Sequence, residues 1–376
     1  MKKVIITVVF TIFILNSCGI YKPDTRPEVA TDNLFGSTVE TADTVTIGNL
    51  QWQEIFTDAD LQGLIRTGLE NNTDLRIARL RITRSEASLK AAKMSYFPAV
   101  SLNPQAAVGS FDGSNPSKTY QLPVSASWEA DIFGRLTNIK RQQRAALEQS
   151  EAYRQAVQTS LIAHIANSYC TLLMLDKQLE ITAQTEITWE ENVKAMRALK
   201  TAGQTSEAAV AQAEANKLSV TAAIIDLKRQ ITEVENALCA ALGETPHAIT
   251  RGRLENQSLP ETLSVGIPLQ LLSNRPDVMS AEASLKQAFY AVGEARSYFY
   301  PSLTLSGSVG WTNSGGAVIS NPGALLWQAI GSLTQPLFSQ GRNKARLETA
   351  KAQQEEAKLF FQQTLLNAGA EVNNAL

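Results

Sequence analysis

The 376-residue sequence has little of what catalysis or metal binding usually requires. Its only histidines are His164 and His247, and they show no metal-binding spacing. The serine-hydrolase pattern GxSxG, the zinc pattern HExxH and a phosphate-binding glycine loop are all absent. Each histidine is therefore interpreted as a packing or surface residue. These absences predict a protein that is not an enzyme and that carries no metal and no cofactor.

An excess of one charge and a disulfide framework are also missing. The chain has 34 basic and 36 acidic residues, and this net charge of -2 argues against nucleic acid as a partner. Beyond Cys18 only Cys170 and Cys239 occur, at nearly equal distances from Gly203. Packed helix axes lie about 8 to 10 Å apart, whereas a disulfide needs Cα atoms within about 7 Å. We expect Cys170 and Cys239 to be free thiols in the core.

Proline is absent between Arg135 and Leu242, and Gly203 is the only glycine there. Because these residues are the strongest breakers of helices, the segment predicts two long helices joined by a tight turn. The arms, Leu136–Ala202 and Gln204–Leu242, would be about 100 Å and about 58 Å long. A helix predicted at Asp74–Ser95, about 33 Å long, would cover the rest of the longer arm. An ordinary helical bundle would also explain the arms, but such a long helix favours a protein that spans a distance.

Both arms carry apolar residues at helical spacing, which predicts that they pack against each other. The stripes are Val157, Leu161, Ile165, Tyr169, Leu172 and Leu179 in the first arm, and Val220, Ile224, Leu227, Ile231, Val234 and Leu238 in the second.

The N-terminal residues are typical of an export signal. Lys2 and Lys3 precede the apolar run Val4–Leu15, which is too short to span a bilayer, and small residues follow it. We assign residues 1–17 to a signal peptide. Cys18 resembles the modified cysteine of a bacterial lipobox and is the predicted lipidation site, so that an acyl chain would hold the mature end at a membrane surface. Residues 18–59 lack a helical period and are predicted to form a lipidated N-terminal arm that is either extended and irregular or partly disordered.

The chain contains an internal duplication. Residues 71–100 align without a gap on residues 274–303, and residues 128–135 match residues 335–342. A short helix is predicted at Asp60–Glu70, and Thr73 is the predicted cap of the helix that follows. The resulting division has a first repeat of helix, two strands and long hairpin at 60–249, an inter-repeat linker at 250–268 and a second repeat at 269–376.

Each repeat contains two segments with strand character. Ser302–Thr312 alternates, with Leu303, Leu305, Val309 and Trp311 on one side, and Tyr120–Trp128 alternates with Leu122, Val124, Ala126 and Trp128. Ala99–Phe111, interrupted by Pro104, and Leu325–Phe338 are weaker. Each is about as long as a tilted strand that crosses a bilayer, although a soluble sheet would also fit. Four strands cannot close a transmembrane barrel, so a membrane protein would have to be a dimer, trimer or tetramer.

Several separated motifs occur in a characteristic order. A central signature consists of Leu259, Pro260, Val265, Gly266, Ile267, Pro268, Arg275, Pro276, Asp277, Tyr300, Pro301, Ser302 and Leu303. The strand–helix junctions contain Phe133, Gly134 and Arg135 and, in the second repeat, Phe338, Gly341 and Arg342, and the hairpin turn contains Gly203, Gln204, Thr205 and Ser206. Together these motifs resemble the TolC-like outer membrane factors, and in particular the lipoproteins of RND-type efflux systems known as the NodT group. The hairpin turn resembles that family's periplasmic tip.

The resemblance implies an α+β membrane protein: a homotrimer with a twelve-stranded β-barrel in the outer membrane and an α-helical periplasmic tunnel. Its partners would be outer membrane lipid, a periplasmic adaptor protein that contacts the tip, and an inner-membrane RND pump. The function implied is passive conduction of exported small molecules. Gly19 is not the aspartate that retains well-studied enterobacterial lipoproteins in the inner membrane, which agrees with an outer membrane location.

The sequence departs from that family in one respect. The second repeat stops at Leu376, the equivalent of Tyr169, so we expect an incomplete second repeat. The acidic gate residues that the resemblance implies would lie beyond that point, and none is assigned; Glu207 is expected to be a solvated charge. The alternative function is a periplasmic adaptor lipoprotein with a coiled-coil hairpin. The duplicated strand pair argues against it, because an adaptor needs only one hairpin.

Overall fold

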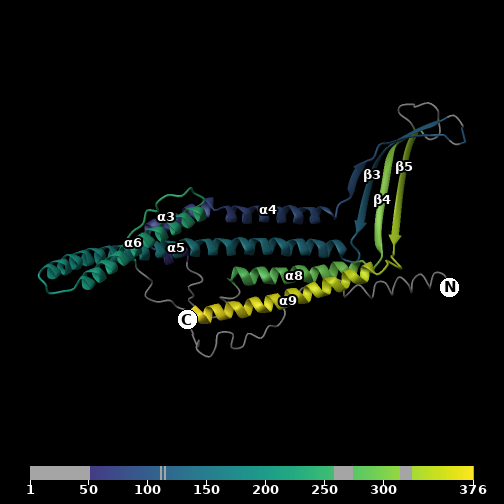
Figure 1. Cartoon of the computed structure of the whole chain (residues 1–376). Coiled ribbons are helices and arrows are strands. Elements are labelled where there is room, and N and C mark those ends of the chain that lie inside the picture. Colours follow the sequence, from purple (N-terminus) through teal and green to yellow (C-terminus); the bar gives the residue numbers. More distant parts are fainter. Residues whose placement is uncertain (1–50, 111, 114–115, 258–273, 314–323, 376) are drawn as a thin grey trace. The chain divides into compact units, whose positions relative to one another are not determined.

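The computed structural model describes residues 51–110, 112–113, 116–257, 274–313 and 324–375 (Figure 1). The predictions for the signal peptide, for Cys18 and for most of the N-terminal arm and the linker fall outside these residues. The chain forms two compact units. Of the described residues, the sheet unit contains 81–110, 112–113, 116–152, 275–313 and 324–375, and the hairpin unit contains 51–80, 153–257 and 274. Helices α4 (Thr73–Met94) and α5 (Arg135–Thr201) contribute a segment to each unit.

An antiparallel sheet dominates the sheet unit. Its strands are β1 (Ala99–Leu102), β2 (Gln105–Gly109), β3 (Ser117–Ala130), β4 (Ser302–Thr312) and β5 (Ala324–Thr334). Both β1 and β2 pair with β3, so they form one edge that is interrupted at Asn103 and Pro104. Proline has no backbone N–H to donate, which explains the break. The predicted strand at 302–312 is confirmed residue for residue, and the weaker predicted segments correspond to β1, β2 and β5.

The register gives the sheet one apolar face. Trp311 lies opposite Leu122, Val309 opposite Val124 and Leu305 opposite Trp128, so the two predicted apolar sets share a face. β5 continues the same rows, and its Trp327 pairs with Val309. Most of the large side chains of this face are exposed, above all Trp327 at 74%, while Trp128 and Leu303 are half-buried. The opposite face carries Gln121, Ser125, Ser127, Thr304, Ser306, Ser308, Gln328 and Ser332, with Leu326 and Ile330 as exceptions.

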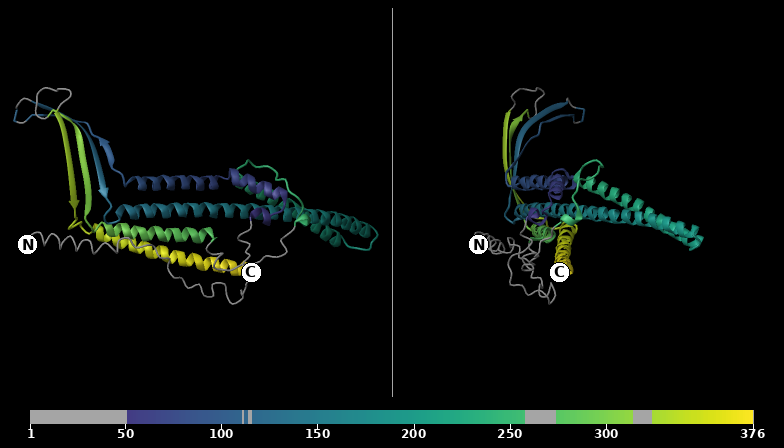
Figure 2. Two further views of the ribbon diagram at one scale, coloured as in Figure 1. Left: turned by 180° about the vertical axis from the view of Figure 1, so that it is seen from behind. Right: turned by 90° about the vertical axis from the view of Figure 1, so that its left-hand side faces the viewer.

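Helices α8 (Pro276–Ser297) and α9 (Arg342–Ala375) run side by side in the sheet unit (Figure 2). A small core joins them, built from Val292, Ala295 and Ala350 with Leu347 packed against it. Gly293 of α8 approaches the first segment of α5 closely, because a Cβ on it would lie 2.5 Å from Oδ1 of Asn138. The side chain of Asn138 is buried and donates a hydrogen bond to the carbonyl oxygen of Gly134.

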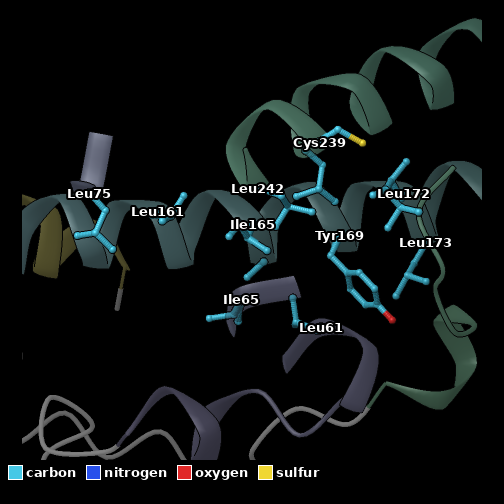
Figure 3. Packing of buried hydrophobic residues seen from close by; sticks show 13 residues of the cluster. Leu61, Ile65, Leu75, Leu161, Ile165, Tyr169, Leu172, Leu173, Cys239 and Leu242 are labelled. Carbon is cyan, nitrogen blue, oxygen red and sulfur yellow. The ribbon is translucent and has the colours of Figure 1, made fainter. Parts of the chain in front are cut away.

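The hairpin unit contains α2 (Trp52–Ile55), α3 (Ala59–Asn71), the second segment of α5, α6 (Glu207–Leu242) and the 3-10 turn η4 (Leu254–Asn256). Its core lies where α3, α5 and α6 meet (Figure 3). Several members of the predicted stripes are buried there: Leu161, Ile165, Tyr169 and Leu172 of α5 and Leu238 of α6. α5 has 67 residues and α6 has 36, which confirms the prediction of two unequal long arms.

Two local predictions are wrong. The cap of α4 is Asn72 and not Thr73, because Asn72 Oδ1 accepts a hydrogen bond from the backbone of Leu75 at 3.0 Å. The Nδ2 of Asn72 also donates a hydrogen bond to the carbonyl oxygen of Ala241. This contact joins the C-terminal cap of α3 to α6, and local sequence does not encode it. Both thiols are free as predicted, and Cys239 is buried, but Cys170 is exposed and is not a core residue.

Within the described residues, no helix combines the length and the apolarity that a membrane-spanning helix requires.

Candidate functional site: strand–helix junctions and hairpin tip

The first junction lies between β3 and α5, and two acidic side chains organise it. Arg135 Nε donates to Glu129 Oε1 at 2.7 Å, and its Nη2 also contacts the same carboxylate. This hydrogen bond holds the pKa of Arg135 above its usual value despite partial burial. Asp131 caps α5: its carboxylate accepts from the backbone N–H groups of Leu136 and Thr137, both at 2.8 Å. The charges at this junction are therefore paired or hydrogen-bonded.

Aromatic rings surround the first junction. Phe133 stacks on Tyr300, with ring centroids 5.0 Å apart. Tyr298 lies near two guanidinium groups, with Arg346 3.9 Å and Arg135 6.0 Å from the ring centroid. A cavity of about 260 Å³ is lined by Phe133, Arg135, Tyr298 and Tyr300 together with Glu129, Asp131, Pro301 and Pro336. The predicted residues Phe133 and Arg135 thus meet at one place, and Gly134 supplies the left-handed turn with φ +71°.

The second junction, between β5 and α9, also turns through a left-handed glycine, but its chemistry differs and Gln340 before the glycine is left-handed as well, with φ +52°. Gly341 has φ +79°, which matches Gly134. The cap is weaker, since Ser339 Oγ accepts from the backbone of Asn343 at 3.4 Å. Phe338 is 85% exposed, and among the described residues it has no stacking partner of the kind found for Phe133. Arg342 donates to the carbonyl oxygen of Ser339, and no ion pair of Arg342 occurs among the described residues.

The hairpin tip has the geometry that Gly203 predicts. Gly203 has a φ of +73°. The N–H of Gly203 donates to the carbonyl oxygen of Lys200, and the N–H of Gln204 donates to the carbonyl oxygen of Leu199, both at 2.9 Å. These bonds form a Schellman motif, in which glycine accepts the left-handed conformation at little cost. Ser206 precedes α6 and caps it, because its Oγ accepts from the backbone of Ala209 at 3.3 Å.

Polar contacts join α5 and α6 above the tip. Lys200 pairs with Glu207, so the acidic side chain predicted to be solvated is an exposed partner in an ion pair. Farther from the turn, Arg197 pairs with Glu214 at 2.7 Å, and Lys217 pairs with Glu190 at 3.5 Å. Gly203, Gln204 and Ser206 are exposed at the end of the hairpin, while Thr205 is half-buried. The tip is therefore a rigid, polar surface.

Sequence reasoning missed two polar clusters that fasten residues 251–257 to the hairpin. Arg251 donates to Asp176 at 2.6 and 2.9 Å and to Glu235 at 2.6 Å. The first of these interactions helps to hold the pKa of Arg251 above its usual value. Neither partner is close in sequence, and no local pattern indicates the pairing.

The second cluster centres on Asp58, the cap of α3. Tyr169 Oη and Gln257 Nε2 donate to its carboxylate at 2.9 and 2.6 Å. Burial alone would raise the pKa of Asp58, but these hydrogen bonds and those from the α3 backbone lower it. Burial raises the pKa of Tyr169 to about 12. The cluster therefore joins three distant segments through a buried tyrosine.

No group of three or more potential metal ligands occurs in the part of the chain that the structure describes. A sheet with an exposed apolar face, joined by tight glycine turns to very long helices, defines the architecture of a TolC-like outer membrane channel. In each repeat, one helix precedes the strands and another follows them after the junction.

Comparison with known proteins identifies the family. The model of the outer membrane efflux protein family matches residues 64–244 and 267–376. The probable outer membrane lipoprotein SilC of Salmonella typhimurium is 29% identical over 389 residues, which cover all of this chain and 83% of that protein. The cation efflux system protein CusC of Escherichia coli is 28% identical, over 96% of this chain and 80% of the relative. The chain belongs to the outer membrane efflux protein family.

Solved structures agree with this family assignment. A crystal structure of CusC superimposes with a TM-score of 0.84 at 26% identity, covering 94% of this chain and 82% of that one. The open outer membrane channel MtrE of Neisseria gonorrhoeae gives a TM-score of 0.80 at 30% identity, over 94% and 80% of the two chains. The chain is thus an outer membrane efflux channel protein, and the predicted location is confirmed. The adaptor alternative receives no support.

The unequal caps of the two junctions lead to a stability prediction. Asp131→Ala removes three hydrogen bonds at the start of α5, and loss of such a cap costs about 0.5 to 2 kcal/mol. Ser339→Ala removes one bond of 3.4 Å and should cost less. Thermal loss of helical circular dichroism in detergent measures both. Equal destabilisation by the two substitutions would contradict the assigned difference between the caps.

Proposed function

We propose that three copies of this chain form the exit duct of a tripartite RND-type efflux pump. Each copy contributes four strand positions to a twelve-stranded barrel in the outer membrane, and the helices form a periplasmic tunnel. The duct conducts exported small molecules passively between a periplasmic adaptor and the outside. The observation that carries this proposal is the register of the sheet, which places one apolar and one mainly polar face along its whole width.

The need for several copies follows from backbone hydrogen bonding. Within the part of the chain that the structure describes, the edges formed by β1 with β2 and by β5 each have one side without a partner strand. Inside a bilayer every backbone N–H and C=O must be paired, so only a closed barrel is viable, and about eight strands is the smallest. Two, three or four copies satisfy that count, and similarity to the TolC-like channels favours three.

The two faces suit the two environments of such a barrel. Leu122, Leu305, Val309 and Trp311 would contact acyl chains, while Ser125, Ser127, Ser306 and Ser308 would line water. A lumen lined by hydroxyl groups offers hydrogen bonds but no strong charge. It therefore supports passage of varied solutes without a tight binding site.

The hairpin tip is proposed as the adaptor contact. Gly203, Gln204 and Ser206 are exposed on a turn fixed by the Schellman motif and by the Lys200–Glu207 ion pair. A rigid turn loses little conformational entropy on binding, which favours its use as a docking surface. The tip follows the C-terminal end of α5, a helix of 67 residues that is about 100 Å long at about 1.5 Å of rise per residue.

The domain division predicted from the sequence is retained as part of the proposal. It comprises an export signal, a lipidated arm beginning at Cys18 and two repeats joined by a linker. The order helix, strands, long helix occurs as α4, β1 to β3 and α5, and again as α8, β4, β5 and α9, which supports the two repeats. The acyl chain on Cys18 would add a second membrane attachment to that of the barrel.

Paired arginine substitutions test the orientation of the sheet. Leu305 lies two residues from the middle of β4 on the apolar face, and Ser306 lies on the polar face. Leu305→Arg should cost about 2 to 4 kcal/mol if it lies near the bilayer midplane, whereas Ser306→Arg should be tolerated. Heat-stable assembly in extracted outer membranes provides the measurement. Equal tolerance of both substitutions would refute the membrane barrel.

Cysteine crosslinking tests the tip. Gln204→Cys and Thr205→Cys leave both Gly203 and the Ser206 cap intact, and each should crosslink to the adaptor in cells. The protein should otherwise lack thiols, with Cys170 and Cys239 replaced by alanine. Ala223→Cys is the control, because Ala223 is also exposed but lies about 24 Å along α6 from its start. Crosslinking at Ala223→Cys but not at the tip would place the adaptor elsewhere.

Mass spectrometry of the mature N-terminus tests the anchor. We expect a chain that begins at Cys18 and carries a diacylglyceryl group on its sulfur. A mature chain that begins at another residue, or a free thiol at Cys18, would refute lipidation without affecting the barrel.

A further inference from the structure

The two strand–helix junctions differ in charge. In the gap-free match between residues 128–135 and 335–342, Glu129 and Asp131 of the first junction correspond to Pro336 and Phe338 of the second. The arginine is retained as Arg342, but Glu129, the acidic partner of its counterpart Arg135, and the acidic cap Asp131 are both replaced by apolar residues. The first junction is therefore neutralised from within, and the second is not.

The residues around this second turn are exposed and form a mixed apolar and basic surface. Leu337 is 94% and Phe338 85% exposed at the end of the β5 segment. Arg342 is exposed, and among the described residues it donates a hydrogen bond only to a backbone oxygen. No acidic residue occurs in the first turn of α9. Lys344 is 80% exposed, and its contact with Glu348 at 3.9 Å is a weak surface pair.

This surface continues the apolar face of the sheet. Leu325, Trp327 and Leu333 of β5 are all exposed on that face. β5 has 11 residues, about the length of a tilted strand that crosses the hydrocarbon core. Leu337 and Phe338 follow its last residue by three and four positions, which places them near the level of the lipid headgroups at the end where α9 begins (Figure 1).

Resting on the proposed function, we propose that Leu337, Phe338, Arg342 and Lys344 form a docking surface for an anionic phospholipid of the inner leaflet. The two apolar side chains contact the acyl chains, and the two basic side chains contact the phosphate and the charged headgroup. Guanidinium groups match phosphate oxygens in shape and charge. A zwitterionic lipid carries no net charge and gains less from the same residues. We name these four residues the junction lipid surface.

Lipid-specific fluorescence quenching tests this proposal in the full-length assembly. A bimane label on Phe338→Cys, in a protein with Cys170 and Cys239 replaced by alanine, is reconstituted in vesicles containing brominated phosphatidylglycerol or brominated phosphatidylcholine. We expect the relative association constant to favour phosphatidylglycerol about fivefold, the effect typical of one basic residue at a membrane surface. The preference should fall at high salt and disappear in Arg342→Gln/Lys344→Gln.

The first junction supplies a matched control. Ile132 follows Asp131 in the first turn and is also exposed, but the charges beside it are paired. A label on Ile132→Cys should therefore show no preference between the two lipids. The same assembly without labelled cysteines supplies the background signal.

A label on Leu305→Cys separates this proposal from the proposed function. Quenching at Leu305→Cys with equal quenching by both lipids at Phe338→Cys would refute the junction lipid surface and leave the barrel intact. Absence of quenching at Phe338→Cys by either lipid would also refute it, because a second copy would then cover the site. Absence of quenching at Leu305→Cys as well would refute the membrane barrel itself.

Discussion

The pairing of β3 with β4 is the interaction on which the rest of the sheet depends, because it joins strands that are almost 200 residues apart in sequence. Ten consecutive residue pairs, from Gln121↔Thr312 to Ala130↔Leu303, fix a single register. Side chains alternate with a period of two, so a shift of one residue would turn Leu305 and Val309 to the opposite face. Every assignment of an apolar or a polar face, and therefore the membrane interpretation, follows from this register.

The junctions transfer that order from the sheet to the helices. At Gly134 and Gly341 the backbone reverses through a left-handed residue, and a hydrogen-bonding side chain then satisfies the first N–H groups of the helix. Asp131 does this at α5 with short bonds, and Ser339 does it weakly at α9. Duplicated geometry therefore does not mean duplicated chemistry. The junction of the first repeat neutralises its charges internally, whereas the junction of the second repeat leaves its charges available to the surroundings.

Features set by local sequence were predicted well. Alternation gave the bounds of β4, the isolated Gly203 gave the hairpin turn, and Pro104 marked the break between β1 and β2. Features that depend on distant partners were not. Asn72 and Thr73 are both good capping residues, and only the contact of Asn72 with Ala241 selects between them. The approach of Tyr298 to Arg346 and the pairing of Arg251 with Asp176 likewise arise from tertiary contacts that no motif encodes.

The interrupted edge formed by β1 and β2 has a consequence for how such a channel could be made. In the proposed trimer that edge meets β5 of the next copy, so all three seams are identical and head-to-tail, and the ring closes only when the third copy arrives. A single chain would leave two strand edges without partners, a state that the hydrocarbon core of a bilayer does not tolerate. Insertion and oligomerisation would then be one concerted event, and its yield would rise steeply with the local concentration of newly exported chains.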